Sequence, residues 1–471
     1  MIDYKKLGFM AGLEVHQQLD TGKLFCRCPS YLRKDSPDFK IKRKLHAVAG
    51  ETGEVDIAAE FESSKEKEFI YEGYNNTTCL IELDEEPPKL INQEALEVAM
   101  QISLLLNCEI VPCSQIMRKT VIDGSNTSGF QRTLLLAKNG WVETKSGVVE
   151  IWYVYLEEDA ARTISKEKNQ ATFRLDRLGV PLVEIVTAPD IETAEQAKEV
   201  ALHIGELIRA CKVKRGIGTI RQDINISIKK SNRVELKGFQ DPKIMIQTVN
   251  NEIKRQEKIL ISGKKNPMEV RQVLPDGDSK FLRPLPGGAR MYPETDLPLL
   301  KISRDLINEV KKTLPKLKSD IRAELEKHGL TEELISLVLQ SNKTLDEFET
   351  LLRVHNKDAN LVAKMITLWR IDKEKITERI LEQILEALNE KKIEKEDVKD
   401  VIKKISGGVS VEEAIKVKKV SHDEIEEEIS KIIKEKPGLR PNAYMGLVMT
   451  KFKGQLDAKK AMEIINRLIK N

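Results

Sequence analysis

The sequence predicts an α+β protein in which a mixed α/β front part is followed by an all-helical connector and a small helical tail. In the front part, short apolar runs alternate with Gly and Pro turns, a pattern that is typical of strands. After residue 297, Gly and Pro become sparse, and Leu and Ile recur at helical spacing among Lys and Glu. A Gly407-Gly408 pair then interrupts the helical pattern. We therefore expect domains at residues 1–297, 298–405 and 406–471.

Strands are expected in the front part at residues 10–16, 148–156, 181–187, 222–228 and 234–237. In the first of these, Leu13 and Val15 alternate with Glu14 and His16, so the two pairs face opposite sides of a sheet. The Ser231-Asn232 turn predicts that the last two strands pair with each other.

Helix signals complete the pattern. Two helices are expected in the front part, at residues 92–107 and 192–211, and the second follows a start signal at residues 188–190. In the back part, apolar spacing predicts helices at 303–314, 318–328 and 331–340.

Composition excludes several classes of protein. The chain has 471 residues, of which 40% are hydrophobic and 32% charged, as is typical of a soluble globular protein. Its net charge of +3 excludes a polybasic tail, and its apolar runs fall far short of the roughly 20 residues of a membrane span. Six cysteines in so long a chain do not make a disulfide scaffold, and the N-terminus lacks a signal peptide. We expect a cytoplasmic protein with reduced thiols and no membrane partner.

Acidic residues occur where strand interiors should be apolar. Glu14 and His16 share one face of a strand, and Glu184 interrupts the apolar run 181–187. Glu157 and Glu158 lie at the end of another predicted strand. A buried carboxylate is costly unless it is paired or binds a metal. Oxygen ligands with one imidazole favour Mg²⁺ that holds nucleotide phosphates, and the alternative is a strand face paired with arginines.

Two irregular segments are further candidates. Residues 118–132 form a polar loop with Lys119 and Ser125, whose backbone N–H groups could hold phosphate or carboxylate, although an ordinary hairpin loop is the alternative. The loop is not a Walker A motif, and no G-x-G-x-x-G fingerprint occurs. The proline-rich segment 281–298, which carries Arg290, either lines a site or crosses between domains.

Three cysteines suggest a zinc site. Cys26 and Cys28 form a close pair, and Cys79 is a third thiol. Structural zinc usually has four ligands, and His46 is the candidate for the fourth. Because the sequence offers no second close pair, a degenerate site without zinc is the alternative.

Two lysines in the tail could meet phosphates. Lys451 and Lys453 flank an aromatic residue close to Gly446, which permits close approach. Helix packing is the alternative for this stretch.

The motifs together resemble a known family, the glutamyl-tRNA(Gln) amidotransferase B/E family, and those that carry the resemblance lie at residues 12–16, 156–160, 174–186 and 292–296. Within the family, residues 83–88 and 123–132 resemble the archaeal E-type subunits. Typical E-type subunits carry an insertion similar to one in bacterial aspartyl-tRNA synthetases before the segment 283–286. Here residues 265–268 lead almost directly into that segment, so the insertion is missing.

The resemblance implies both architecture and activity. Residues 1–297 would be a catalytic cradle domain, and residues 406–471 a YqeY-like tRNA-binding tail. Mg²⁺–ATP would phosphorylate the side chain of Glu on misacylated Glu-tRNA(Gln), and ammonia would displace the phosphate to give Gln-tRNA(Gln). An asparaginase-like D-type subunit would supply the ammonia in a heterotetramer, because nothing in this chain resembles an amidase.

The motifs also imply roles for single residues. The expected metal ligands are His16, Glu158 and Glu184. The expected catalytic residues are Glu14, Glu157 and Lys119. Contacts to substrate or nucleotide are expected from Arg174, Arg177, Ser125 and Arg290, and contacts to the tRNA body from Lys451 and Lys453.

Two alternatives stay open on the sequence alone. The chain could be a B-type subunit of a three-subunit enzyme that also acts on Asp-tRNA(Asn). It could instead be a non-catalytic tRNA-binding scaffold. The missing insertion supports this alternative, whereas the intact acidic residues argue against it.

Overall fold

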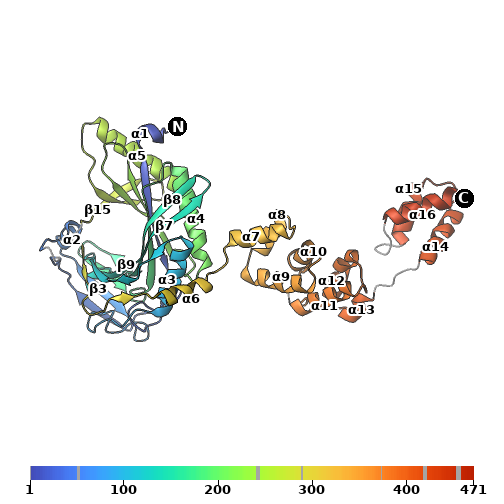
Figure 1. The fold of residues 1–471 in the computed structure, drawn as a ribbon, viewed down its shortest axis with the longest axis horizontal. Helices are drawn as coiled ribbons and strands as arrows, with labels where there is room; N and C mark the ends of the chain where they lie inside the picture. Colours follow the sequence, from blue (N-terminus) through green and yellow to red (C-terminus); the bar gives the residue numbers. More distant parts are fainter. Residues whose placement is uncertain are drawn as a thin grey trace. The chain divides into compact units, whose positions relative to one another are not determined.

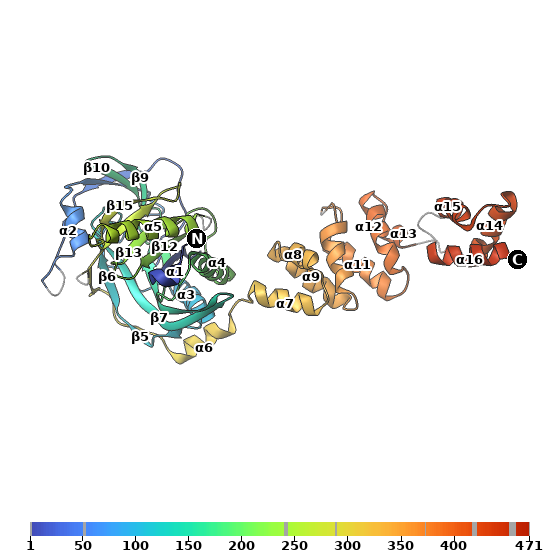
Figure 2. The ribbon, with the colours of Figure 1, turned by 90° about the horizontal axis from the view of Figure 1, so that it is seen from above.

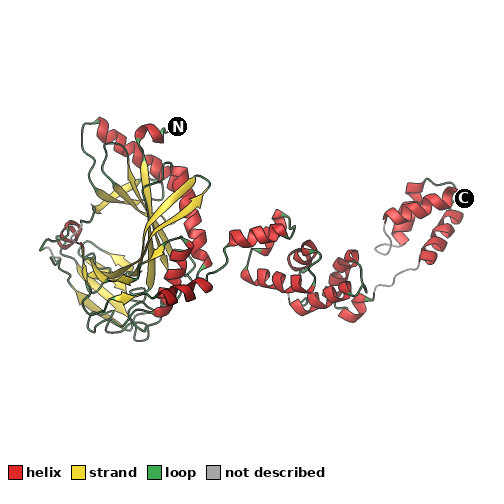
Figure 3. Cartoon of the chain, in the orientation of Figure 1, coloured by secondary structure: helices red, strands yellow, loops and turns green. Residues whose placement is uncertain are grey.

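A computed structural model describes residues 2–49, 53–239, 244–287, 290–372, 374–416, 422–451 and 458–470 (Figure 1). The chain divides into two compact units, Met1–Leu317 and Lys318–Asn471. Among the described residues, strands occur only in the first unit, and the second unit is helical (Figure 3). The α+β prediction is therefore confirmed.

The first unit is built on a sheet that has eleven strands among the described residues, in the order β15-β14-β13-β12-β1-β11-β8-β7-β6-β16, with β4 paired to β7. All five predicted strands belong to it. Its members are β1 (Met10–Gln18), β4 (Glu109–Ile110), β6 (Ile116–Thr120), β7 (Phe130–Thr144), β8 (Gly147–Glu158), β11 (Pro181–Thr187), β12 (Ile220–Ser227), β13 (Val234–Phe239), β14 (Glu269–Val273), β15 (Ser279–Pro284) and β16 (Met291–Pro293).

One face of this sheet is apolar and carries helices. Leu13 and Val15 of β1 are fully buried in the main core, as the alternation predicts. Helices α3 (Gln93–Leu105) and α4 (Ala194–Ala210) pack against the sheet and against each other (Figure 1). The side chains of Asn92 and Thr193 cap the helix starts by accepting backbone N–H bonds. Both helices therefore begin within two residues of the predicted bounds, although the cap of the second is Thr193 and not the predicted signal at 188–190.

A smaller sheet, β2-β3-β10-β9, has its own aromatic core. Its strands are β2 (Phe39–Arg43), β3 (Glu68–Gly73), β9 (Arg162–Lys166) and β10 (Gln170–Arg174), and Figure 2 shows β9 and β10 apart from α3 and α4. A two-stranded pair joins β5 (Cys113–Ser114) to β17 (Leu300–Lys301). The remaining helices of the first unit are α1 (Tyr4–Leu7), α2 (Ile57–Ser63), α5 (Met245–Ile261) and α6 (Arg304–Lys312).

The segment 281–298 belongs to the sheet. β15 pairs with β14, and β16 pairs with β6, where Tyr292 opposes Arg118. Glu294, which follows β16, is fully buried and accepts two hydrogen bonds from Arg118 and one from Arg132. The segment therefore contributes strands at both ends of the strand order, β15 and β16, and does not merely cross between domains.

The second unit contains two separate hydrophobic clusters. The larger is formed by α7 (Lys318–Lys327), α8 (Glu332–Val338), α9 (Asn342–Val354), α10 (Ala359–Lys364), a π-helix (Met365–Trp369), α11 (Glu378–Asn389), a 3-10 turn (Lys395–Asp397), α12 (Val398–Ser406) and α13 (Val411–Ile415). The smaller is formed by α14 (His422–Glu435), α15 (Pro441–Lys451) and α16 (Ala458–Lys470). Across the described ranges, no helix is long and apolar enough to cross a bilayer.

Strand β1 offers a test of the core. Leu13→Ala is expected to lower the free energy of unfolding by about 2–5 kcal/mol, because it opens a cavity around a fully buried side chain in the central strand. Met10→Ala, at a 51% exposed position of the same strand, is the control, with an expected loss below about 1 kcal/mol. Thermal unfolding of the full chain measures both, and equal losses would contradict the assignment of the two faces.

Candidate functional site

The register of β1 brings acidic groups from three strands together. β1 lies between β11 and β12, and places His16 opposite Glu184 and Glu14 opposite Asp223. Residues opposite each other on antiparallel strands project to the same face, here the face away from Leu13. Ligand atoms of Glu14, His16 and Asp223 all lie within 4.8 Å of one another. His16 Nε2 lies 3.7 Å from Glu184 Oε2.

Two lysines compensate the buried negative charge. Lys119 Nζ donates to Glu157 Oε1 at 2.6 Å and to Glu184 Oε2 at 3.2 Å. Lys237 Nζ donates to Asp223 Oδ2 at 2.6 Å and also bonds the carboxylate of Glu235. Each lysine offsets the charge of one of the two carboxylates that it bridges, which lowers the cost of burying them together.

The carboxylates differ in their affinity for protons. Burial raises the pKa of Glu157, and the charge of Glu184 raises it further, to about 7, although Lys119 opposes both effects. Burial also acts to raise the pKa of Glu184, but the charge of Lys119 and the neighbouring imidazole of His16 outweigh it and hold that pKa well below its usual range. Near neutral pH Glu157 is therefore partly protonated, whereas Glu184 keeps its negative charge.

A cavity of about 390 Å³ opens over these groups. Carboxylates and His16 lie at its floor, and basic residues complete its wall. Three residues expected from the sequence, Lys119, Ser125 and Arg290, also line it. The other basic lining residues are Arg221, Arg233, Lys237 and Arg283.

The donor chemistry fits Mg²⁺. Glu14 and Asp223 offer hard carboxylate oxygens, and His16 offers one imidazole nitrogen beside them. Mg²⁺ prefers oxygen ligands and often takes only one or two carboxylates from the protein together with substrate phosphates. The open side of the cavity leaves room for such phosphates.

Glu158 does not reach this site. It neighbours Glu157 on β8, and consecutive strand residues project to opposite faces. Its carboxylate lies 3.3 Å from Arg132 Nη1 and lines a separate small cavity that Cys26 and Glu82 share. Of the three expected metal ligands, His16 and Glu184 lie together, and the neighbouring Glu157, not Glu158, lines their cavity.

Two of the expected arginines lie outside the cavity wall. Arg174 forms an ion pair with Glu72 at 2.7 Å. Arg177 donates to the backbone carbonyls of Ala160 and Ala161. Both side chains are therefore anchored by local contacts beside the cavity rather than within its lining.

Sequence reasoning did not select Asp223 or Lys237 for the site, whereas Arg283 belongs to the segment 281–298 that was expected to line one. Asp223 alternates with buried isoleucines on β12, and this polar face was the available signal. Its pairing with Glu14 follows only from the strand order, which places β12 beside β1. Lys237 lies on β13 and Arg283 on β15, and both strands belong to the same sheet, beyond β12 in the strand order.

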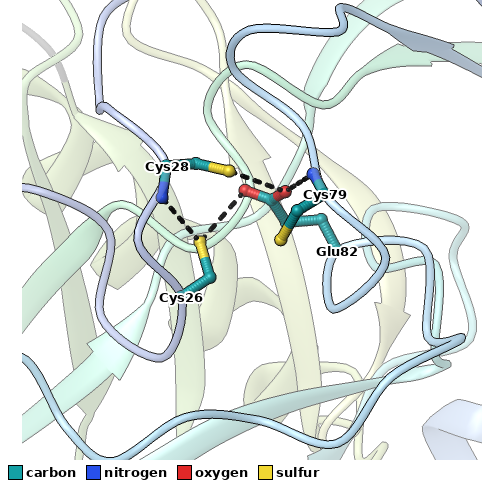
Figure 4. A group of neighbouring side chains, drawn as sticks. All are labelled: Cys26, Cys28, Cys79 and Glu82. Carbon is teal, nitrogen blue, oxygen red and sulfur yellow. Dashed lines mark hydrogen bonds between the residues drawn. The ribbon is translucent and has the colours of Figure 1, made fainter.

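The three cysteines expected to bind zinc come together with Glu82 (Figure 4). Their ligand atoms lie within 4.8 Å of one another, and among the described residues the fourth ligand-type side chain is this carboxylate, not His46. Cys26 Sγ lies 3.5 Å from Glu82 Oε1, and Cys28 Sγ lies 3.7 Å from Oε2. Hydrogen bonds from Cys26 and Cys28 lower the pKa of Cys79, which favours the thiolate that metals bind.

Lys23 adds a buried positive charge to this cluster. Its side chain is fully buried and bonds the carboxylate of Glu82 and the carbonyls of Thr77 and Leu175. Three thiolates and a carboxylate exceed the charge of one divalent ion, so a fixed ammonium group helps to balance them. Thiolate and carboxylate donors are both known zinc ligands.

The tail lysines are only partly described. Lys451 ends α15, and its exposed side chain pairs with Glu428 of α14. Lys453 lies outside the described residues.

Comparisons with known proteins identify the family of this chain. The GatB/GatE catalytic domain matches residues 9–308. The chain is 36% identical to the glutamyl-tRNA(Gln) amidotransferase E subunit of Methanocaldococcus jannaschii, over 100% of this chain and 99% of the relative. It is 35% identical to the E subunit of Methanothermobacter thermautotrophicus, over 78% and 80%, and 32% identical to that of Methanococcus vannielii, over 100% and 98%.

The alignments also bear on the missing insertion. The comparison with the M. jannaschii protein extends over 627 positions, whereas this chain has 471 residues. The relative therefore carries well over a hundred residues that have no counterpart here. That these residues form the insertion expected before residue 283 stays a prediction. The match along the whole length nevertheless leaves the family clear: this chain belongs to the GatB/GatE family, among relatives of the E type.

Proposed function

We propose that this chain is the component of a tRNA-dependent amidotransferase that activates and amidates glutamate on misacylated Glu-tRNA(Gln). The observation that carries the proposal is the single cavity in which Glu14, His16, Glu184 and Asp223 converge beneath a basic wall. A phosphoryl transfer needs a metal-binding floor and cationic groups around the phosphates, and this arrangement supplies both.

The reaction has two steps. The γ-phosphoryl group of ATP passes to the side-chain carboxylate of the glutamyl ester, giving an acyl phosphate and ADP. Ammonia then attacks the acyl carbon, phosphate leaves, and Gln-tRNA(Gln) is formed. Bound Mg²⁺, held by Glu14, His16 and Asp223 with Glu184 beside them, would neutralise phosphate charge. Arg283 and Arg290, which also line the cavity, would bind phosphate oxygens.

The wall groups also determine the reacting geometry. Lys119 is held by Glu157 and Glu184, so its ammonium group stays at one place in the cavity. A positive charge fixed there would orient the glutamyl carboxylate before phosphoryl transfer and stabilise charge that develops during it. Ser125 also lines the cavity, and its hydroxyl donates to Asp123 Oδ1 at 2.6 Å.

Ammonia has to come from another protein. We propose an asparaginase-like D-type subunit as the source, in a heterotetramer, since the M. jannaschii and M. vannielii relatives that match the full length are E-type subunits. The same relatives disfavour the alternative of a B-type subunit that also acts on Asp-tRNA(Asn). Co-purification with an asparaginase-like protein rather than an amidase would separate these two hypotheses.

The first test is direct. The purified full chain, incubated with Glu-tRNA(Gln), Mg²⁺–ATP and high ammonium, is expected to form Gln-tRNA(Gln) only when ATP is present. Free ammonia bypasses the partner, so the product reports the site of this chain alone. Absence of product both with and without the added asparaginase-like partner would favour the non-catalytic scaffold and reject the proposal.

His16→Ala and Asp223→Asn test the proposed Mg²⁺ ligands at the floor of the cavity. Each is expected to lower ATP-dependent product formation by at least about 100-fold, because phosphate charge loses its compensation. Binding of tRNA, measured by filter retention, is expected to stay within about twofold. His203→Ala, on the outer part of α4, is the control. A parallel loss of tRNA binding in the floor variants would overturn the metal assignment.

We propose zinc for the cluster of Cys26, Cys28, Cys79 and Glu82, as a structural ion that ties residues 26–28 to residues 79–82. The full chain purified without chelator is expected to hold about one zinc per molecule by elemental analysis. Cys79→Ser should remove most of it, whereas Cys113→Ser, at an exposed thiol outside the cluster, should not. Equal zinc in both variants would show that the metal binds elsewhere.

A further inference from the structure

A row of partly exposed arginines leads from the smaller sheet into the cavity. We call it the arginine row, and it consists of Arg174, Arg33, Arg162, Arg177 and Arg221. At its outer end, the side chains of Arg162 and Arg174 both donate to the backbone carbonyl of Arg33, at 2.8 and 3.4 Å. The three residues are thus fixed to one another.

The inner end of the row reaches the candidate site. Arg177 and Arg221 share the carboxylate of Asp159, at 3.7 and 2.9 Å. Asp159 and Arg221 both line the cavity that holds His16. The row is therefore continuous with the site rather than a separate surface feature.

The carboxylates that hold the row are buried, whereas the guanidinium groups reach solvent. The side chains of Asp159 and Asp176 are 2% and 0% exposed, but those of Arg162, Arg177 and Arg221 are 22–29% exposed. Among the described contacts, Arg162 and Arg177 bond through Nε and Nη2, and neither uses Nη1. The protein thus holds the Nε–Nη2 edge of each of these two guanidinium groups, and the N–H donors of Nη1 remain for a ligand.

Aromatic and apolar side chains lie beside the row. Arg33 and Arg174 lie over the ring of Tyr74, with centroid distances of 4.4 and 5.7 Å, and because Tyr74 is fully buried its ring supports these arginines and is not itself a surface for a base. Tyr31 is 48% exposed next to them. Ile217 is 99% exposed in the loop that leads into β12, the strand of Arg221.

This combination points to single-stranded nucleic acid. Proteins bind single strands by a positive groove that follows the backbone and by side chains on which bases stack. Guanidinium groups with fixed orientation suit phosphate oxygens, because they offer paired donors. A free nucleotide is too compact to use the whole row, whereas an extended strand would follow it into the cavity.

We propose that the arginine row binds the sugar-phosphate backbone of the unpaired 3′ end of the substrate tRNA and leads its aminoacylated terminus to the cavity. This inference rests on the proposed function and adds the place where the substrate enters. It also supplies a tRNA contact in the first unit that does not depend on the insertion that this chain lacks.

The test compares two RNAs on the full chain. Arg162→Ala is expected to weaken binding of intact tRNA(Gln) about tenfold and to reduce the slope of log K against log salt by about 0.7, the value for one lost single-strand phosphate contact. Binding of the same tRNA shortened by its unpaired 3′ nucleotides should not change. Fluorescence anisotropy at several salt concentrations measures both RNAs.

Two further variants keep the result interpretable. Arg162→Lys retains a charge beside Asp176 and should lose less affinity than Arg162→Ala, while folding as the parent does. Arg255→Ala is the matched control, because Arg255 also pairs with a buried carboxylate, Glu252, and is 25% exposed. It should leave both RNAs unaffected.

The outcomes separate this inference from the function on which it rests. Equal weakening of intact and shortened tRNA by the Arg162 variants, or no weakening of either, would overturn the arginine row as the 3′-end site while ATP-dependent amidation stood. Failure of the parent chain to bind tRNA at all would reject both.

Discussion

The candidate site depends on the register of one strand. β1 is paired on both sides, and its two neighbours fix which of its side chains share a face. A slip of one residue would turn Glu14 and His16 into the helix-covered core and expose Leu13 and Val15. The burial of those apolar residues therefore holds the polar ones in position, so the same alternation stabilises the sheet and builds the site.

A second constraint is the balance of buried charge. The sheet carries carboxylates on both faces of β8, where Glu157 meets Lys119 and Glu158 meets Arg132. Arg132 also pairs with the fully buried Glu294, which is bonded by Arg118 as well. Removing one partner of such a pair would leave a buried charge without compensation, which is energetically costly. These charged residues therefore hold one another in place. Their positions are consequently rigid, which phosphoryl transfer requires.

The first unit contains the proposed chemistry and the proposed entrance for the substrate. Cys26 and Glu82 line the small cavity that also borders Glu158 and Arg132, so the cysteine cluster and the charged network share a wall. A metal in that cluster would fix the loop that carries Cys28 as well as the turn that carries Cys79. The helical unit has its own cores, and the roles of Lys451 and Lys453 in binding tRNA remain proposals.

The sequence by itself determined the α+β class, the five strands, the two front helices and the motifs that resemble the amidotransferase family, because each is encoded in local periodicity, capping residues or short motifs. It also identified His16 and Glu184 as a pair worth testing. Only the tertiary structure decided that Asp223 joins them, that Glu157 rather than Glu158 faces the cavity, and that Glu82 completes the cysteine cluster. These facts depend on strand order, register and pleat phase, which arise from contacts between residues far apart in the chain, and no local pattern specifies them.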